Sequence, residues 1–346
     1  DHTDSWLAQA FVMVNGYSSD YHGKDWCITV FDDCFGFGDR DLEYKRFRYA
    51  EYDENYRQTQ WTEAYFGIRQ ASIMIQYVHL NQELTEREII DYRGQARFIR
   101  AYLYWKLLQK YGPITIIPDD AGMDFNLSYE ELSLPRNSYD ECVEYIVKEL
   151  EIAATELERD RDGRNIVRPT VGTALAARAK VLLYSASPIN NPGGPNDPHP
   201  EETFTDLVDD KGRMLMSQTY DEKKWARAAA AARDVIELGK YQLHVEKSRE
   251  TGTDGIPPTV EPPYLAGYSD KPFPEGWQGI DPMRSYQVLF NGDIILINNE
   301  ELIWTTGQNS DVRTDLARHN MPLLSGGYNC HFMTGKMCDA YENNDG

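Results

Sequence analysis

The sequence contains no long apolar segment and none of the common motifs that mark enzymes. Its apolar runs are far shorter than the roughly 18 residues that a membrane-spanning helix needs, although 41% of its 346 residues are hydrophobic. It has no phosphate-binding loop, nucleophile elbow, H-E-x-x-H zinc motif or G-x-G-x-x-G dinucleotide motif. We therefore expect no membrane span, no enzyme activity and no cofactor.

Cysteine and histidine are scarce and lack the spacing of metal or redox sites. The five cysteines contain no C-x-x-C pair and the seven histidines are scattered, so no zinc ribbon, thioredoxin-type site or other metal site is indicated. Cys142 falls on an apolar helical stripe and is expected to be a small buried residue. Cys27 and Cys34 are near in sequence, but spacing alone leaves their pairing open.

Basic residues are also few. The chain has 35 Lys and Arg against 56 Asp and Glu, a net charge of -21. A surface this negative repels phosphate backbones and anionic lipids, so binding to nucleic acid or directly to a lipid surface is disfavoured. With so many carboxylates, neighbours such as Asp32 and Asp33 are expected by chance and do not predict a glycosidase.

Aromatic residues are abundant, at 12% of the chain, and the 23 Tyr are nearly twice the 12 Phe. Tyrosine combines an apolar ring with a polar tip. Two interpretations remain open at this point: packing between large helices whose ring edges reach water, and a surface that stacks against a ligand or a protein partner.

Helical periodicity is the clearest pattern in the chain. Apolar positions recur at helical intervals in five segments, and capping residues mark their ends: Ser138 with Glu141 has the spacing of a capping box, and Thr170 is suited to cap the next segment. Gly112 and Pro113 end one helix, after which residues 114–117 are expected to be a short strand or an extended exit. We predict helices near 62–79, 86–111, 139–158, 170–186 and 221–238.

These helices should form a scaffold over about 61–240, and long insertions interrupt it. Residues 20–55, 189–220 and 245–292 are rich in Gly, Pro, Asp, Asn and aromatics. Pairs of helices 35 to 50 residues apart resemble tetratricopeptide packing, although the repeat is imperfect. Long loops on a helical scaffold are where binding sites usually lie.

Several segments resemble the SusD-like (RagB/SusD) family. The run YRGQARFIRAYLYWKLLQKYGPITII, from Tyr92 to Ile117, is similar to the second helix of the family's first tetratricopeptide unit, and RPTVGTALAARAKVLLYSASPINN, from Arg168 to Asn191, is similar to its second-unit helix. WTEAYFGIRQASIMI, which begins at Trp61, resembles the helix that opens the first unit. NNEELIWTTGQN and MCDAYENNDG resemble later family segments.

The resemblance implies a mainly α fold, a SusD-like α-α superhelix of tetratricopeptide-like helix pairs with long loop insertions and little sheet. It implies one SusD-like domain over residues 1–346, which we expect to be incomplete at both ends. Family arginines and tyrosines at positions such as Arg97, Arg100, Tyr104 and Tyr111 are expected to pack or pair within the scaffold rather than touch ligand.

The implied function is a lipid-anchored lipoprotein on the extracellular face of the outer membrane of Bacteroidetes-type bacteria. Such a protein binds an oligosaccharide and passes it to a SusC-like TonB-dependent outer-membrane transporter, with membrane contact only through an N-terminal lipid anchor that this chain lacks. Two alternatives remain: a peptide-binding member of the family, and a tetratricopeptide scaffold for protein-protein interaction.

No motif carries ligand positions over from the family, so the site is predicted from loop position and residue type. Aromatics of the first and third insertions are expected to meet over the scaffold as one stacking platform with a few polar partners. The simpler alternative is that each aromatic anchors its own loop to the core. The predicted ligand-binding residues are Trp26, Phe35, Phe37, Asp39, Arg40, Tyr44, Tyr264, Trp277, Tyr286 and Asn291.

Overall fold

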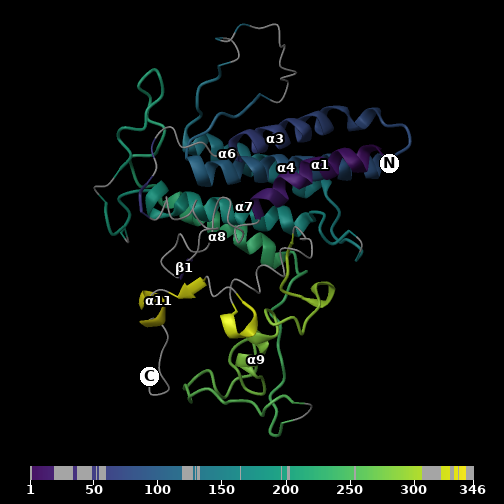
Figure 1. Cartoon of the computed structure of the whole chain (residues 1–346), viewed down its shortest axis with the longest axis vertical. Coiled ribbons are helices and arrows are strands. Elements are labelled where there is room, and N and C mark those ends of the chain that lie inside the picture. The colour runs from purple at the N-terminus through teal and green to yellow at the C-terminus, as the bar shows by residue number, and fades with distance from the viewer. Residues whose placement is uncertain are drawn as a thin grey trace.

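The computed structural model shows a stack of helices with a loop-rich region on one side (Figure 1). It describes residues 2–18, 34–36, 49–51, 53, 60–118, 128, 130, 133–163, 165–195, 197–200, 203–252, 255–305, 321–327, 331–333 and 335–339. The α-helices are α1 (His2–Ser18), α3 (Gln60–Tyr77), α4 (Glu86–Tyr111), α6 (Tyr139–Glu156), α7 (Val171–Ala186), α8 (Glu222–Glu237), α9 (Pro282–Gln287) and α11 (Gly335–Asp339). Short 3-10 turns lie at Val78–Leu80, Pro188–Asn190, Leu296–Asn298 and Leu323–Ser325.

The five predicted helices correspond to α3, α4, α6, α7 and α8, so the mainly α prediction is confirmed. Their starts follow the capping residues. Ser138 accepts a hydrogen bond from the backbone N–H of Glu141, and the Glu141 carboxylate accepts one from the Ser138 N–H in return. Thr85 and Glu88 form the same capping box before α4. Gly112, with a φ of 66°, ends α4 in a conformation that glycine adopts at little cost.

Sequence neighbours are also neighbours in space within the stack. Helix α1 packs on α3, α3 on α4, α4 on α6, α6 on α7 and α7 on α8, and these helices lie side by side in the upper half of Figure 1. This arrangement is the one expected for helix pairs in series.

Helix α4 lies at the centre of the core. Phe98, Ile99, Leu103 and Leu107 are fully buried. Tyr104 is also fully buried, and its hydroxyl accepts the backbone N–H of Ile117 at 3.0 Å. Burial of several large side chains on every face of one helix explains why it lies between α3 and α6.

A buried ionic network joins α4 to α6. Arg97 donates to Glu149 and to Glu156, each at 3.1 Å, Arg100 donates to Glu149 at 2.5 Å, and Arg93 donates to Glu156 at 2.7 Å. Buried carboxylates cost several kcal/mol unless they are paired, so the arginines of α4 neutralise both acids of α6. The expectation that Arg97 and Arg100 pair within the scaffold is confirmed.

Tyr111 also belongs to the scaffold, because its ring meets Trp61 edge-on with 5.1 Å between ring centroids. The Trp61 ring in turn packs on the Tyr65 ring, with 5.0 Å between their centroids. Many of the tyrosines and tryptophans of α3 and α4 therefore serve helix packing, the simpler of the two interpretations of the aromatic excess.

Helix α1 was not predicted. Its apolar residues Leu7, Ala10 and Val14 are buried against the core. Asp4 accepts a hydrogen bond from Arg168 at 2.7 Å, which ties the start of α1 to the segment before α7. The spacing of Leu7, Ala10 and Val14 is that of one helical face and was the signal available in the sequence.

Sheet structure is limited, among the described residues, to one antiparallel pair of short strands, β1 (Cys34–Gly36) and β2 (His331–Met333). Residues 114–117 take the extended form rather than a strand: Ile114 accepts the N–H of Asn137 at 2.9 Å, and the Asn137 side chain accepts the N–H of Ile116. Of the helices described, none combines the length and apolar character needed to cross a membrane. The single-domain boundary of 1–346 stays a prediction.

Candidate functional site

Residues 241–305 form a loop-rich lobe, described apart from residues 253–254, whose two ends are held together beside the helices. The backbone N–H of Gln242 donates to the carbonyl of Glu300 at 3.3 Å. The N–H of His244 donates to the Glu301 carboxylate at 2.8 Å. A chain of this length thus returns to its starting point, which restrains the loops between.

Trp304 joins this lobe to the scaffold. Its ring lies edge-on to Phe98 and Tyr102 of α4, at 5.1 and 5.4 Å between centroids, and its indole N–H donates to the carbonyl of Val167 at 2.9 Å. The end of the lobe is therefore fixed to the central helix.

Within the lobe, the short helix α9 is held by the buried side chain of Asp281. The Asp281 carboxylate caps the helix by accepting the N–H of Arg284 at 2.9 Å and also accepts the Thr259 hydroxyl at 2.8 Å. Pro282 occupies the first turn, where its missing N–H costs nothing. Six residues are too few for a stable isolated helix, so these contacts decide that α9 forms.

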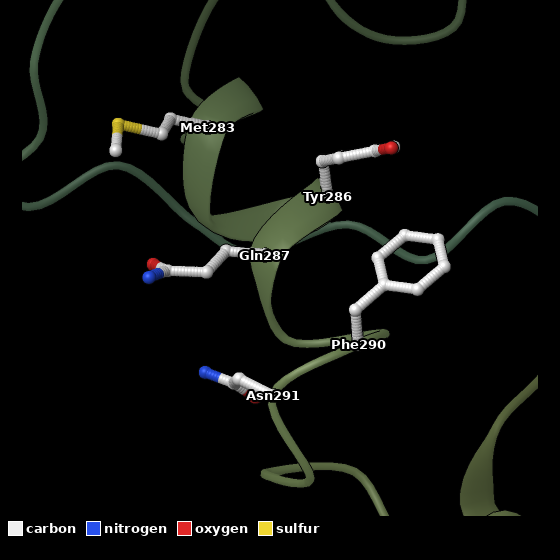
Figure 2. A pocket seen from close by; sticks show the side chains of 5 residues that line it. All are labelled: Met283, Tyr286, Gln287, Phe290 and Asn291. Carbon is white, nitrogen blue, oxygen red and sulfur yellow. The ribbon is translucent and has the colours of Figure 1, made fainter. Parts of the chain in front are cut away.

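Helix α9 and the turn after it line a shallow hollow of about 510 Å³ (Figure 2), which we call the α9 hollow. Tyr286 and Phe290 project to one side of the helix in Figure 2, with ring centroids 4.9 Å apart and planes 50° apart. They are 69% and 73% exposed. The residues that line the hollow are Met283, Tyr286, Gln287, Phe290 and Asn291.

The α9 hollow combines two exposed rings with two side-chain amides. The apolar C–H faces of sugars stack on aromatic rings, and amides bond to hydroxyl groups as donors and acceptors. Asn291 is oriented by Asp293, because its Nδ2 donates to the Asp293 carboxylate at 3.0 Å and its Oδ1 accepts the Asp293 N–H at 2.9 Å. Rings and oriented amides of this kind are suited to a polyhydroxylated ligand.

Of the predicted site residues, the structure brings Tyr286 and Asn291 together in this hollow. Tyr264 and Trp277 lie elsewhere in the lobe and do not line it. Trp277 is half-buried and stacks on Tyr268, with 5.8 Å between centroids and 13° between planes. Tyr264 is 71% exposed, and its hydroxyl donates to Asp270 at 2.7 Å, which raises the pKa of Tyr264.

The predicted residues of the first insertion fall almost wholly outside the described residues. Phe35 is part of β1, where its backbone lies opposite Phe332 of β2. Whether the first and third insertions meet in one platform stays a prediction. The residues outside the description are Trp26, Phe37, Asp39, Arg40 and Tyr44.

A second hollow of about 640 Å³ lies at the base of the lobe, where its two ends meet. Phe273 supplies an aromatic ring that is 38% exposed. The His244 imidazole lies 3.1 Å from the Glu246 carboxylate. Gln242, Leu243, His244, Val245, Phe273, Pro274, Asn298 and Glu300 line this basal hollow.

Sequence reasoning did not include Met283, Gln287 and Phe290 in the site. The signal was the four-residue spacing of Met283, Gln287 and Asn291, and of Tyr286 and Phe290, directly after an Asp-Pro helix start. Across the part of the chain that the structure describes, no group of His, Cys, Asp and Glu is arranged to hold a metal ion.

A family model described as starch-binding and associating with the outer membrane matches residues 29–183. No curated protein matches the chain. The solved structure of BT4246 matches 70% of this chain and 41% of its own at 25% identity and a TM-score of 0.57. The structure of selenomethionine BT4246 matches over 88% of this chain and 50% of its own length, at 23% identity and a TM-score of 0.59.

A SusD-like protein, BF3747 from Bacteroides fragilis NCTC 9343, matches 89% of this chain and 46% of its own, at 17% identity and a TM-score of 0.53. The chain thus spans half or less of the length of these solved relatives. The matched family region contains α3, α4, α6 and most of α7, the helices that hold the signature segments. The predicted resemblance to the SusD-like family is confirmed: the family model matches residues 29–183, and the chain is similar in structure to SusD-like proteins.

Proposed function

We propose that this protein binds oligosaccharides at the cell surface, captures them for import and does not hydrolyse them. The observation that carries the proposal is the pair of exposed rings, Tyr286 and Phe290, beside the Asn291 amide on a SusD-like scaffold. The family's description as starch-binding and associated with the outer membrane supports both the ligand class and the location.

Solvent exposure of this pair favours a binding role over a packing role. Most aromatics of α3 and α4 are covered by neighbouring helices, whereas Tyr286 and Phe290 touch each other and leave most of their surface open. Aromatic contacts contribute about 0.5 to 1.5 kcal/mol each beyond their buried area. Two such rings, together with the amide hydrogen bonds, would each contribute to the affinity of a shallow site.

The proposal includes a partner and an anchor. We propose that one face of the protein contacts a SusC-like TonB-dependent outer-membrane transporter, and that a lipid anchor holds the protein on the extracellular face of the outer membrane. The net charge of -21 favours a basic rim on that transporter, since complementary charge steers association. Affinity purification from native outer membranes should recover a barrel protein, and repeated recovery of none would contradict the partnership.

Isothermal titration tests the ligand class directly. Maltoheptaose, laminarihexaose, cellohexaose and a xyloglucan oligosaccharide should be titrated into the protein and into the variants Tyr286→Ala and Phe290→Ala. For the sugar that binds, each variant should lose about tenfold in affinity, since 1.4 kcal/mol is one decade. Tyr77→Ala, at a 51% exposed position of α3, is the matched control and should bind like the unmodified protein.

The same titration separates the alternatives. Binding of a casein peptide digest with no response to any sugar would favour the peptide-binding alternative. Release of sugar fragments during incubation would contradict the non-enzymatic proposal. Protease-accessible protein on intact cells would support the surface location, whereas an intracellular pool alone would favour the tetratricopeptide scaffold.

A further inference from the structure

We infer that the oligosaccharide bound at the α9 hollow is uncharged, so that the site takes neutral glycans and disfavours chains that carry uronic acids or sulfates. The inference rests on the proposed function. It adds the charge class of the ligand, which follows from where the charged side chains of the lobe lie.

The first observation is the lining of the α9 hollow. Among the described residues that line it, none is charged: they are two aromatic rings, one thioether and two amides, which Figure 2 shows on α9 and the turn after it. Proteins recognise carboxylates and sulfates mainly through Arg and Lys, whose charge-assisted hydrogen bonds are about twice as strong as neutral ones. The part of the chain that the structure describes places no such group in the lining of the hollow.

The second observation concerns the basic residues of the lobe, of which there are four. The Arg284 guanidinium donates to Asp293 at 3.0 Å, and Arg249 donates to Glu246 at 3.4 Å. These two cations are therefore already neutralised within the lobe. Lys247 and Lys271 line neither the α9 hollow nor the basal hollow.

The third observation is the placement of the acids. Asp293 lies at the rim of the α9 hollow, with its carboxylate 3.0 Å from the Asn291 amide that would contact a sugar. The basal hollow carries Glu300, and its His244 lies against Glu246. In the α9 hollow the charges of Asp293 and Arg284 cancel, so an anionic sugar gains no attraction there, and in the basal hollow it would face the Glu300 carboxylate.

The charge of the wider lobe acts in the same direction. Residues 241–305 contain ten Asp and Glu against four Lys and Arg, a net charge of -6, on a chain of net charge -21. Like charges across a binding surface oppose association and slow the approach of the ligand. A neutral glycan avoids this repulsion while it keeps the ring stacking and the amide hydrogen bonds.

The experiment compares each neutral oligosaccharide of the titration panel with its C6-oxidised form, which carries a carboxylate, and with the methyl ester of that form, which does not. Oligogalacturonate and heparin oligosaccharides complete the panel. For the sugar that binds, the oxidised form should bind at least about tenfold more weakly in 20 mM salt, and the gap should narrow at 300 mM salt. The methyl ester should recover most of the affinity, which separates charge from shape.

A pair of variants at one exposed position tests the cause. Gln287→Lys places a cation in the hollow and should tighten binding of the oxidised sugar severalfold relative to Gln287→Met, which removes the amide without adding charge. Equal or tighter binding of the oxidised form by the unmodified protein, or binding of the anionic glycans alone, would overturn the inference and leave the proposed function standing. Absence of binding to every glycan would overturn the proposed function itself.

Discussion

The indole of Trp304 donates a hydrogen bond to the carbonyl of Val167 at 2.9 Å, across 137 residues of sequence. With its ring against Phe98 and Tyr102, Trp304 is the contact that ties the loop-rich lobe to the central helix α4. Because the candidate site lies in that lobe, Trp304 is one of the contacts that link the scaffold to the site, beside the contact of Tyr241 with Gly172 of α7.

Trp304→Ala should therefore destabilise the protein by about 2 to 3 kcal/mol, less than the full cost of a core tryptophan because the ring is only half-buried. Trp304→Phe keeps an aromatic ring and loses the N–H, so a loss of about 1 kcal/mol is expected. Chemical denaturation measures both values. Trp225→Ala, at a 41% exposed position of α8, should cost less than Trp304→Ala, because less of its ring is buried.

Limited proteolysis gives a second readout of the same substitution. Cleavage between residues 242 and 300 should be faster in Trp304→Ala than in the unmodified protein, because the lobe loses its contact with α4. Unchanged cleavage in that segment would show that other contacts hold the lobe.

Glu149→Gln should be among the most destabilising single changes in the scaffold. The Glu149 carboxylate is nearly fully buried and accepts hydrogen bonds from Arg97 and Arg100. Removing the negative charge leaves a buried guanidinium without its counter-charge, and breaking a buried pair in this way costs about 3 to 5 kcal/mol. Urea denaturation measures the loss.

The control for Glu149 is the exposed pair of Arg233 and Glu237 on α8, with side chains 77% and 55% exposed. Glu237→Gln should cost no more than about 0.5 kcal/mol, since water and salt screen an exposed pair. Similar losses for the two substitutions would contradict a special role for the buried network.

Gly94→Ala should destabilise the α4–α6 contact. A Cβ at this position would lie 2.8 Å from the Cβ of Glu156 and 3.1 Å from the backbone nitrogen of Leu157, closer than normal contact allows. Overpacking of this kind costs about 1 to 3 kcal/mol, and the higher helix propensity of alanine returns at most about 1 kcal/mol. Thermal unfolding should show a net loss.

Gly335 of α11 is the matched control, because a Cβ there would meet no atom of the described residues within 4 Å. Gly335→Ala should leave the melting temperature unchanged or raise it slightly. If Gly94→Ala leaves the melting temperature unchanged, α4 and α6 can move apart without loss of stability, which would contradict the prediction.

Acid should weaken the start of α6 through Glu141. The backbone N–H of Ser138 donates to its carboxylate and lowers the pKa of Glu141, burial opposes this, and the Arg213 guanidinium lowers the pKa further. A carboxyl whose pKa is lowered by folding stabilises the protein above its unfolded pKa. That stabilisation disappears as the pH falls through the folded pKa.

Glu141→Gln keeps a side-chain acceptor but does not titrate. The unmodified protein should be the more stable at pH 7, and the difference should shrink from about pH 5 downward, since free Glu titrates near 4.3. Denaturation curves at several pH values measure this. A difference that stays constant from pH 7 to pH 3 would assign the effect of the substitution to packing.

The helical scaffold could be predicted because its signals are local. The 3.6-residue periodicity and the capping pair of Ser138 and Glu141 involve residues within a few positions of each other, so α3, α4, α6, α7 and α8 lie where the sequence predicts them. The signature run from Tyr92 to Ile117 lies inside the region that the SusD-like family model matches, and it covers a largely buried helix whose arginines pair within the scaffold.

The candidate site depends on contacts between distant residues, which periodicity does not reveal. Loop position and residue type were enough to select Tyr286 and Asn291, but Tyr264 and Trp277 were selected on the same grounds and do not line the α9 hollow. The difference arises because Asp281 and Thr259 hold α9 in place, and Trp304 holds the lobe against α4. Ring exposure is a property of the folded chain: the Trp277 ring is partly covered by Tyr268 and the Phe290 ring is open, because packing between separate segments decides which aromatic ring reaches water.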